Sequence, residues 1–363
     1  MRNPNEYLSI FDGSLERRYF QPTFLPRTVA DLPVRNLRHH EIPTTWTVTF
    51  QRIEVVQDGK VLHTAHGGTQ KITIPRQKTS SAIALTHNGW FPVGFDPWNS
   101  APLYLLDVNM INRIKNIRKA PSKKTDKSSE EDLIHLLNDK GSFVSPIPIL
   151  IEGNPRRSQI GNGPISHERD LIRTLKECLP EANVIAHDQH GYTAKTAVKL
   201  RTLTDIVFKK EVALYEYAVP LLKGTKGNQV VIEEIDRYVR HLELFGTSLM
   251  RVALLAAAAG GKKNDNWFRR LLKIDEANIA PNVAADFRHL YLLLLLRAPE
   301  YLGGCCFLTQ DLLLAKFWCA INLDRSSQDV MNGVARWDMF VDSSSAPQLS
   351  SFDIDMLKDV RQA

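Results

Sequence analysis

The residues best suited to chemistry lie in one short basic stretch, residues 262–270. Four cations bracket an adjacent tryptophan and phenylalanine there, and apolar runs lie on both sides. Lysine and arginine neutralise backbone phosphates, and flat aromatic faces stack on unpaired bases. The stretch therefore predicts contact with single-stranded nucleic acid through Lys262, Lys263, Trp267, Arg269 and Arg270.

The two aromatic residues of this stretch are expected to differ in environment. Leu271 and Leu272 continue the face of Phe268 at i+3 and i+4, so Phe268 is predicted to lie in the core. Trp267 is then predicted to face solvent or a base.

Further cations precede this stretch in the second half of the chain. Lys195 and Lys199 are four residues apart and share one face of a predicted helix. This helix and the next also carry Arg201, Lys209, Lys210, Arg237 and Arg240. Any one such group fits a solvated helix face. Three basic groups in one helical half, in a chain of net charge +6, favour a groove for a polyanion.

Hydrophobic periodicity predicts the elements that carry these side chains. Apolar residues recur at a helical spacing in residues 193–218, 230–245, 248–259, 266–272, 283–297 and 309–321. Strand-like alternation and β-branched runs occur in residues 44–50, 53–56, 61–62, 71–74, 81–85 and 103–106. Asp58 and Gly59 between two of these runs predict a hairpin. The predicted fold is α+β, with a β-containing N-terminal part, a mainly α-helical C-terminal part and extended terminal arms.

Composition divides the chain into four regions. These are an extended arm (1–40), a mixed β-rich domain (41–192), a helical domain (193–341) and a C-terminal tail (342–363). The arm contains four prolines and many apolar residues, so it either folds back on its own domain or docks on a neighbouring copy.

Several local features of the β-rich domain also carry predictions. Residues 113–132 are predicted to form a mobile basic loop, either a solvated linker or a flap that closes on a polyanion. Residues 133–137 are expected to form a short helix, and residues 146–151 an edge strand in which proline is tolerated. Ser166 is predicted to be the N-cap of the following helix.

Catalytic and membrane signatures are weak in this sequence. It contains no phosphate-binding loop, no dinucleotide fingerprint and no nucleophile elbow, so no cofactor is expected and residues 66–68 are interpreted as a turn. His187, Asp188 and His190 are possible metal ligands, but the glycine after them favours a surface loop.

Four cysteines without a paired spacing predict reduced thiols. With no signal peptide and no apolar run of membrane-spanning length, we expect a cytoplasmic or virion-associated protein that is not secreted and has no membrane partner.

These features together favour a non-enzymatic protein that coats single-stranded nucleic acid, with RNA as the expected form. The nucleic acid would lie in a groove between the two parts, and the arms would link copies into a homo-oligomer. The layout resembles that of viral nucleoproteins in architecture, although no family motif matches residue by residue. Three alternatives stay open: a subunit of a larger RNA-guided or nucleic-acid-processing complex, with residues 113–127 as a thumb; a capsid or shell protein; and a hydrolase or nuclease in which His187, Asp188 and His190 converge with a distant acid.

Overall fold

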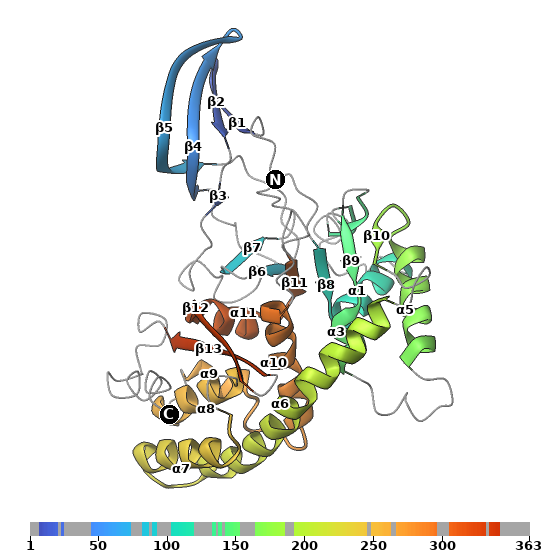
Figure 1. Cartoon of the computed structure of the whole chain (residues 1–363), viewed down its shortest axis with the longest axis vertical. Coiled ribbons are helices and arrows are strands. Elements are labelled where there is room, and N and C mark those ends of the chain that lie inside the picture. The colour runs from blue at the N-terminus through green and yellow to red at the C-terminus, as the bar shows by residue number, and fades with distance from the viewer. Residues whose placement is uncertain are drawn as a thin grey trace.

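The computed structural model gives the arrangement of the chain, with strands gathered in its N-terminal part and helices in its C-terminal part (Figure 1). This confirms the predicted α+β fold. The structure describes residues 7–20, 23–24, 45–73, 82–86, 89–92, 103–119, 133–135, 137–139, 142–152, 164–185, 192–244, 248–262, 266–295, 305–331 and 334–341.

A five-stranded sheet projects from the rest of the molecule, at the top of Figure 1. Its strands are β1 (Tyr7–Asp12), β2 (Leu15–Phe20), β3 (Thr23–Phe24), β4 (Thr45–Gln57) and β5 (Lys60–Thr73). The β4–β5 turn has positive φ at both central residues, 49° at Asp58 and 75° at Gly59. Two-residue hairpins of this kind require that conformation, so the predicted hairpin is confirmed. Residues 66–68, interpreted as a turn, lie instead within β5, where His66 pairs with Arg52.

The described part of the predicted N-terminal arm folds back on its own domain. Strand β2 pairs with β4, and β1 pairs with β2 to extend the sheet. Tyr19 and Phe20 are buried, and the guanidinium of Arg52 lies 3.8 Å from the centre of the Phe20 ring. These contacts explain why the arm carries apolar residues at Tyr19 and Phe20. Docking of the arm on a neighbouring copy stays a prediction.

A six-stranded sheet occupies the centre of the molecule in the order β10-β9-β8-β11-β6-β7 (Figure 1). The strands are β6 (Ile83–Thr86), β7 (Gly89–Pro92), β8 (Leu103–Leu106), β9 (Phe143–Ser145), β10 (Asn183–Val184) and β11 (Cys305–Thr309). Strand β11 lies parallel to β8 and antiparallel to β6, although it belongs to the predicted helical domain. All five of its residues are buried, as expected for a central strand. The two predicted parts therefore share one sheet.

Alternating residues of this sheet face two separate cores. Leu105 and Phe307 pack against the C-terminal helices, whereas Leu106 and Leu308 pack against helices of the N-terminal part. The seam between the two parts is thus filled with apolar side chains. Arg288 is a buried cation that crosses between the parts, since it donates to the Ile151 carbonyl of the N-terminal part.

Three helices of the N-terminal part correct local predictions. They are α1 (Val108–Lys119), α3 (Ile147–Glu152) and α5 (Pro164–Cys178). Residues 113–119 of the predicted basic loop belong to α1, where Ile114 is buried and Arg118 Nε donates to the Cys178 carbonyl at 3.0 Å. The loop prediction is wrong for these residues, because their apolar face has a core to pack against. Residues 120–132 lie outside the described part of the chain. Residues 133–135 are helical, in agreement with the short helix predicted there.

The predicted edge strand at residues 146–151 and the predicted N-cap are also wrong. Residues 147–152 form α3, in which Pro148 occupies the first turn, where a missing N–H leaves no intrahelical bond unmade. The Ser145 hydroxyl accepts from the backbone N–H of Ile147 at 3.3 Å. Helix α5 begins at Pro164, so Ser166 lies inside its first turn; proline is well suited to the first helical position.

The C-terminal part contains the six helices that periodicity predicts. These are α6 (Tyr192–Lys223), α7 (Asn228–His241), α8 (Leu249–Ala259), α9 (Trp267–Leu271), α10 (Ala280–Leu295) and α11 (Leu312–Ala320). A hairpin of β12 (Ile321–Met331) and β13 (Val334–Val341) follows, which the sequence analysis assigned to the helical domain. The predicted tail, residues 342–363, lies outside the described residues.

Candidate nucleic-acid interface

The basic stretch 262–270 meets the C-terminal end of α6. The last carbonyls of a helix lack intrahelical partners and carry partial negative charge. Lys262 Nζ donates to the Lys223 carbonyl at 2.9 Å, and Arg269 Nη1 donates to the Leu222 carbonyl at 3.1 Å. Two of the predicted phosphate ligands therefore also cap a helix. Lys263 lies outside the described residues.

Trp267 does not face solvent as predicted. It is 8% exposed, and its ring stacks on that of Phe268 with centroids 3.8 Å apart. Lys316 Nζ lies 4.6 Å from the Trp267 ring centre. The cause is tertiary: the Asn266 amide donates to the carbonyls of Ala257 and Gly261, which fixes the start of α9 against the end of α8. The expected core position of Phe268 is confirmed, and Trp267 shares it.

Five cations lie around α9, which contacts the end of α6 through Arg269 and contacts α11 through Trp267 and Lys316. We name them the α6-end cluster: Lys223, Lys262, Arg269, Arg270 and Lys316. Burial, and secondly the positive charge of Arg270, lower the pKa of Lys316, so these two like charges are close. Within the described part of the chain, no ion pair joins the five to an acid. Mutual repulsion makes such a cluster a favourable place for an anion.

A second basic surface lies along α7 and rests on a buried carboxylate. Arg251 Nη2 lies 2.9 Å from Asp236 Oδ1, and both side chains are buried. Arg240 Nη2 lies 3.0 Å from Asp236 Oδ2, but the Arg240 side chain is 62% exposed. Asp236, Arg251 and Arg240 form a triad in which Arg251 neutralises the charge of the aspartate. The remaining positive charge of the triad therefore lies on the outward-facing Arg240.

Neighbouring cations extend this second surface. Arg237 is exposed and lies three residues before Arg240 and four before His241, which places the three on one edge of α7. Lys210 Nζ lies 3.6 Å from Glu243 Oε2, which brings the middle of α6 next to the end of α7. We name Lys210, Arg237 and Arg240 the α7 cluster. Lys209 is exposed beside it.

Two tyrosines that the sequence analysis did not single out lie in this surface. The rings of Tyr217 on α6 and Tyr238 on α7 stack with centroids 4.0 Å apart and an interplanar angle of 17°. Tyr238 also contacts His241, at 5.8 Å between ring centres. A signal was available, since Tyr217 lies seven residues after Lys210 on the same helical face, and Tyr238 directly follows Arg237.

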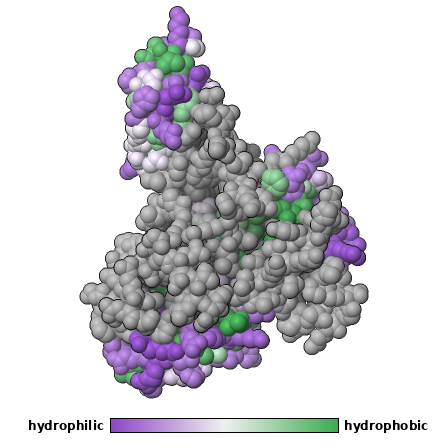
Figure 2. All heavy atoms as spheres, viewed as in Figure 1, coloured by the Kyte–Doolittle hydropathy of each residue, from purple (hydrophilic) through white to green (hydrophobic). Residues whose placement is uncertain are grey.

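The predicted cations do not converge on one compact site. Lys195, Lys199 and Arg201 belong to α6, but their side chains lie outside the described residues. At 1.5 Å rise per residue, Lys199 and Lys223 are about 36 Å apart along the helix. The lower edge of the molecule, where α7 and the C-terminal half of α6 lie, is mainly hydrophilic (Figures 1 and 2). The described cations thus form an extended surface rather than a pocket.

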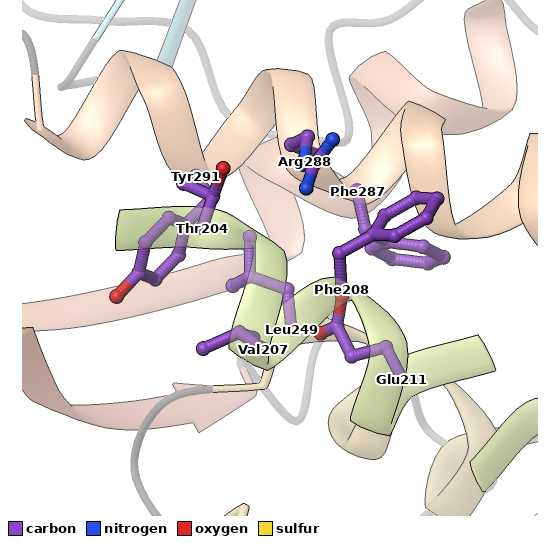
Figure 3. A pocket seen from close by; sticks show the side chains of 8 residues that line it. All are labelled: Thr204, Val207, Phe208, Glu211, Leu249, Phe287, Arg288 and Tyr291. Atoms are coloured by element: carbon purple, nitrogen blue, oxygen red, sulfur yellow. The ribbon is translucent and has the colours of Figure 1, made fainter. Parts of the chain in front are cut away.

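A mainly apolar pocket between α6, α8 and α10 is too small for a substrate (Figure 3). Its free volume of about 10 Å³ corresponds to a single water. Glu211 accepts from the Ser248 hydroxyl at 2.7 Å, and burial raises its pKa to about 7. Arg288 donates to the Ile151 carbonyl at 3.0 Å and pairs with Asp205. These contacts tie helices together, and we interpret the pocket as part of the core.

Other indications of function are scarce. The described residues contain no group of three or more His, Cys, Asp or Glu that would hold a metal ion, and His187, Asp188 and His190 lie outside them. None of the described helices combines the length and the apolarity needed to cross a bilayer. All four cysteines are free thiols, as predicted.

No protein-family model, curated protein or solved structure matches the chain. Only the chemistry of its surfaces is left to indicate a function.

Proposed function

We propose that this protein binds and coats single-stranded nucleic acid, with RNA as the expected form, and that it acts without catalysis. The α6-end cluster is the observation that carries this proposal. Five cations share one end of the helical part, and within the described residues no acid pairs with them. A phosphate backbone neutralises such a cluster and releases its own counterions on binding.

Charge segregation supports a polyanion over a small anion. The α7 cluster adds a second positive surface, which shares only α6 with the α6-end cluster, and the net charge of the chain is +6. Cations spread over tens of ångströms fit a chain of phosphates better than a single phosphate group.

Self-assembly along the nucleic acid is the second element of the proposal. Strand β5 has 14 residues and lies at an edge of the five-stranded sheet, since its pairing within the described chain is with β4 alone. Val61 and Leu62 near its start are exposed. A long open edge with exposed apolar side chains favours strand addition by another copy.

The binding test uses two cations that the fold does not need. Lys223 and Arg270 are exposed, whereas Lys262 and Arg269 cap α6. We expect Lys223→Gln combined with Arg270→Gln to weaken the binding of a labelled single-stranded RNA at low salt by about ten-fold or more, equally for unrelated sequences. The matched control is Arg169→Gln with Lys176→Gln, two exposed cations of α5 with the same loss of charge. Equal affinity of the two double variants would remove the α6-end cluster from the binding site.

The assembly test perturbs the β5 edge without touching the basic clusters. Leu62→Lys places a charge beside the open edge, where it opposes strand addition. Light scattering with RNA present should show smaller particles for Leu62→Lys than for wild type, with RNA affinity per monomer retained. Particles of unchanged size would exclude this edge as the contact between copies.

A further inference from the structure

The Tyr217–Tyr238 pair is an exposed aromatic stack in a basic surface. Tyr217 is 38% exposed, and within the described residues its ring partner is Tyr238 alone. Tyr238 is half-buried and contacts His241 as well. Tyr217 is therefore the open end of the stack, and a further flat ring is able to extend it. The interplanar angle of 17° means that the two rings are nearly parallel, as in a stack of bases.

Positive charge surrounds this stack. Arg237 directly precedes Tyr238 on α7, and Lys210 lies two helical turns before Tyr217 on the same face of α6. Three acids are also close in sequence: Glu216, Glu234, which pairs with Lys226, and Glu243, which pairs with Lys210. Arg240 contributes the outward charge of the buried triad. The surface thus combines an aromatic face with cations on both helices, which is how single-stranded nucleic-acid sites are built.

We propose that Tyr217 and Tyr238 form a stacking platform for one unpaired base, whose neighbouring phosphates are held by Arg237, Arg240 and Lys209. This inference rests on the proposed nucleic-acid function and specifies the form of the ligand. A base inside a duplex already stacks on its neighbours on both sides and has no free face for Tyr217. The platform therefore gives the protein a preference for single strands that the α6-end cluster, which contacts phosphates alone, does not supply. Because every base has a π-face, the preference is independent of sequence.

The test compares two substitutions of Tyr217. Tyr217→Leu keeps an apolar side chain and removes the ring, whereas Tyr217→Phe keeps the ring. The two proteins and wild type are titrated with a single-stranded RNA and with a duplex of equal length. Stacking on one aromatic side chain predicts a loss of roughly five- to 150-fold for Tyr217→Leu on the single strand. We expect Tyr217→Phe to bind like wild type, and duplex affinity to be the same for all three.

A second readout reports stacking directly. A fluorescent base analogue placed in the single strand is quenched when it stacks on an aromatic ring. The quenching that wild type and Tyr217→Phe produce should be absent with Tyr217→Leu at saturating protein. Thermal melts of the free variants show whether each is folded.

The possible failures are distinguishable. Tyr217→Leu could bind RNA and quench the base analogue like wild type while the Lys223→Gln/Arg270→Gln variant loses affinity. In that case the nucleic-acid function stands and the stacking platform is wrong. The two tyrosines then face another kind of partner, such as a protein. If wild type binds neither RNA at low salt, both proposals are wrong. An equal loss of single-strand and duplex affinity in Tyr217→Leu would also overturn the platform.

Discussion

Burial of Glu211 gives the protein a pH-dependent stability whose sign and size follow from the structure. Glu211 is 5% exposed and accepts hydrogen bonds from the Ser248 hydroxyl and the backbone N–H of Met250. Despite these bonds and the nearby positive charge of Arg288, burial raises its pKa from 4.5 to about 7. The folded state therefore holds the proton over a pH range in which the unfolded chain releases it.

The sign of the effect is set by that proton. A carboxyl whose pKa is raised on folding stabilises the fold most at low pH, below its unfolded value of 4.5. Stability then falls as pH rises and reaches its lower level above about 7. At about 1.4 kcal/mol per pH unit, the interval from 4.5 to about 7 corresponds to a loss of about 3 kcal/mol.

Glu211→Gln tests this reasoning, because glutamine keeps an acceptor for Ser248 and cannot ionise. Urea unfolding at pH 5 and pH 8 gives the free energy of unfolding of both proteins. The variant should be close to wild type at pH 5 and more stable than wild type at pH 8, by up to about 3 kcal/mol. Glu216→Gln, on the exposed side of the same helix, is the control and should leave the profile unchanged. A Glu211→Gln profile parallel to that of wild type would refute the assigned burial cost.

Two further predictions concern the supports of the basic surfaces. Asp236→Ala leaves the buried Arg251 without its carboxylate and should lower the free energy of unfolding by about 3–5 kcal/mol, measured by thermal or urea unfolding. Asp170→Ala removes an exposed ion pair and should cost little. Similar stability of the two variants would contradict the role of Asp236 in holding Arg251 and Arg240. Asp311 caps α11 by accepting from the backbone N–H groups of Leu313 and Leu314, so Asp311→Ala should cost about 1 kcal/mol, and Asp311→Asn should recover most of it. An equal cost for both substitutions at Asp311 would point to its charge instead of the cap.

The elements whose conformation depends on residues close together in the sequence were predictable from the sequence. Asp58 and Gly59 specify their hairpin through backbone conformation, and the long helices follow from apolar periodicity. Strand β11 was not predictable in this way, because its partners β6 and β8 lie some two hundred residues earlier in the chain. Helix α3 was missed because a short apolar run with prolines fits an edge strand and a first helical turn equally well.

The same distinction applies to the candidate site. Charge patterning along the sequence found Lys262, Arg269 and Arg270 of the α6-end cluster, and Lys210, Arg237 and Arg240 on α6 and α7. It missed Lys223 and Lys316, which join the cluster only through the packing of α6, α9 and α11. Burial of Trp267 depends on Phe268 and on Lys316 from α11, and no local pattern encodes that packing. Stacking of Tyr217 on Tyr238 likewise depends on how α6 and α7 pack together. The aromatic component of the predicted interface was therefore placed on the wrong side chain.

The salt dependence of RNA affinity tests the central claim most directly. Binding of wild-type protein to a labelled single-stranded RNA is measured by fluorescence anisotropy over a range of salt concentrations. Each phosphate neutralised on a single strand contributes a slope of about −0.7 to log K against log salt. Engagement of the five cations of the α6-end cluster predicts a slope of about −3 or steeper. A slope near zero, or no binding at low salt, would contradict the proposed function.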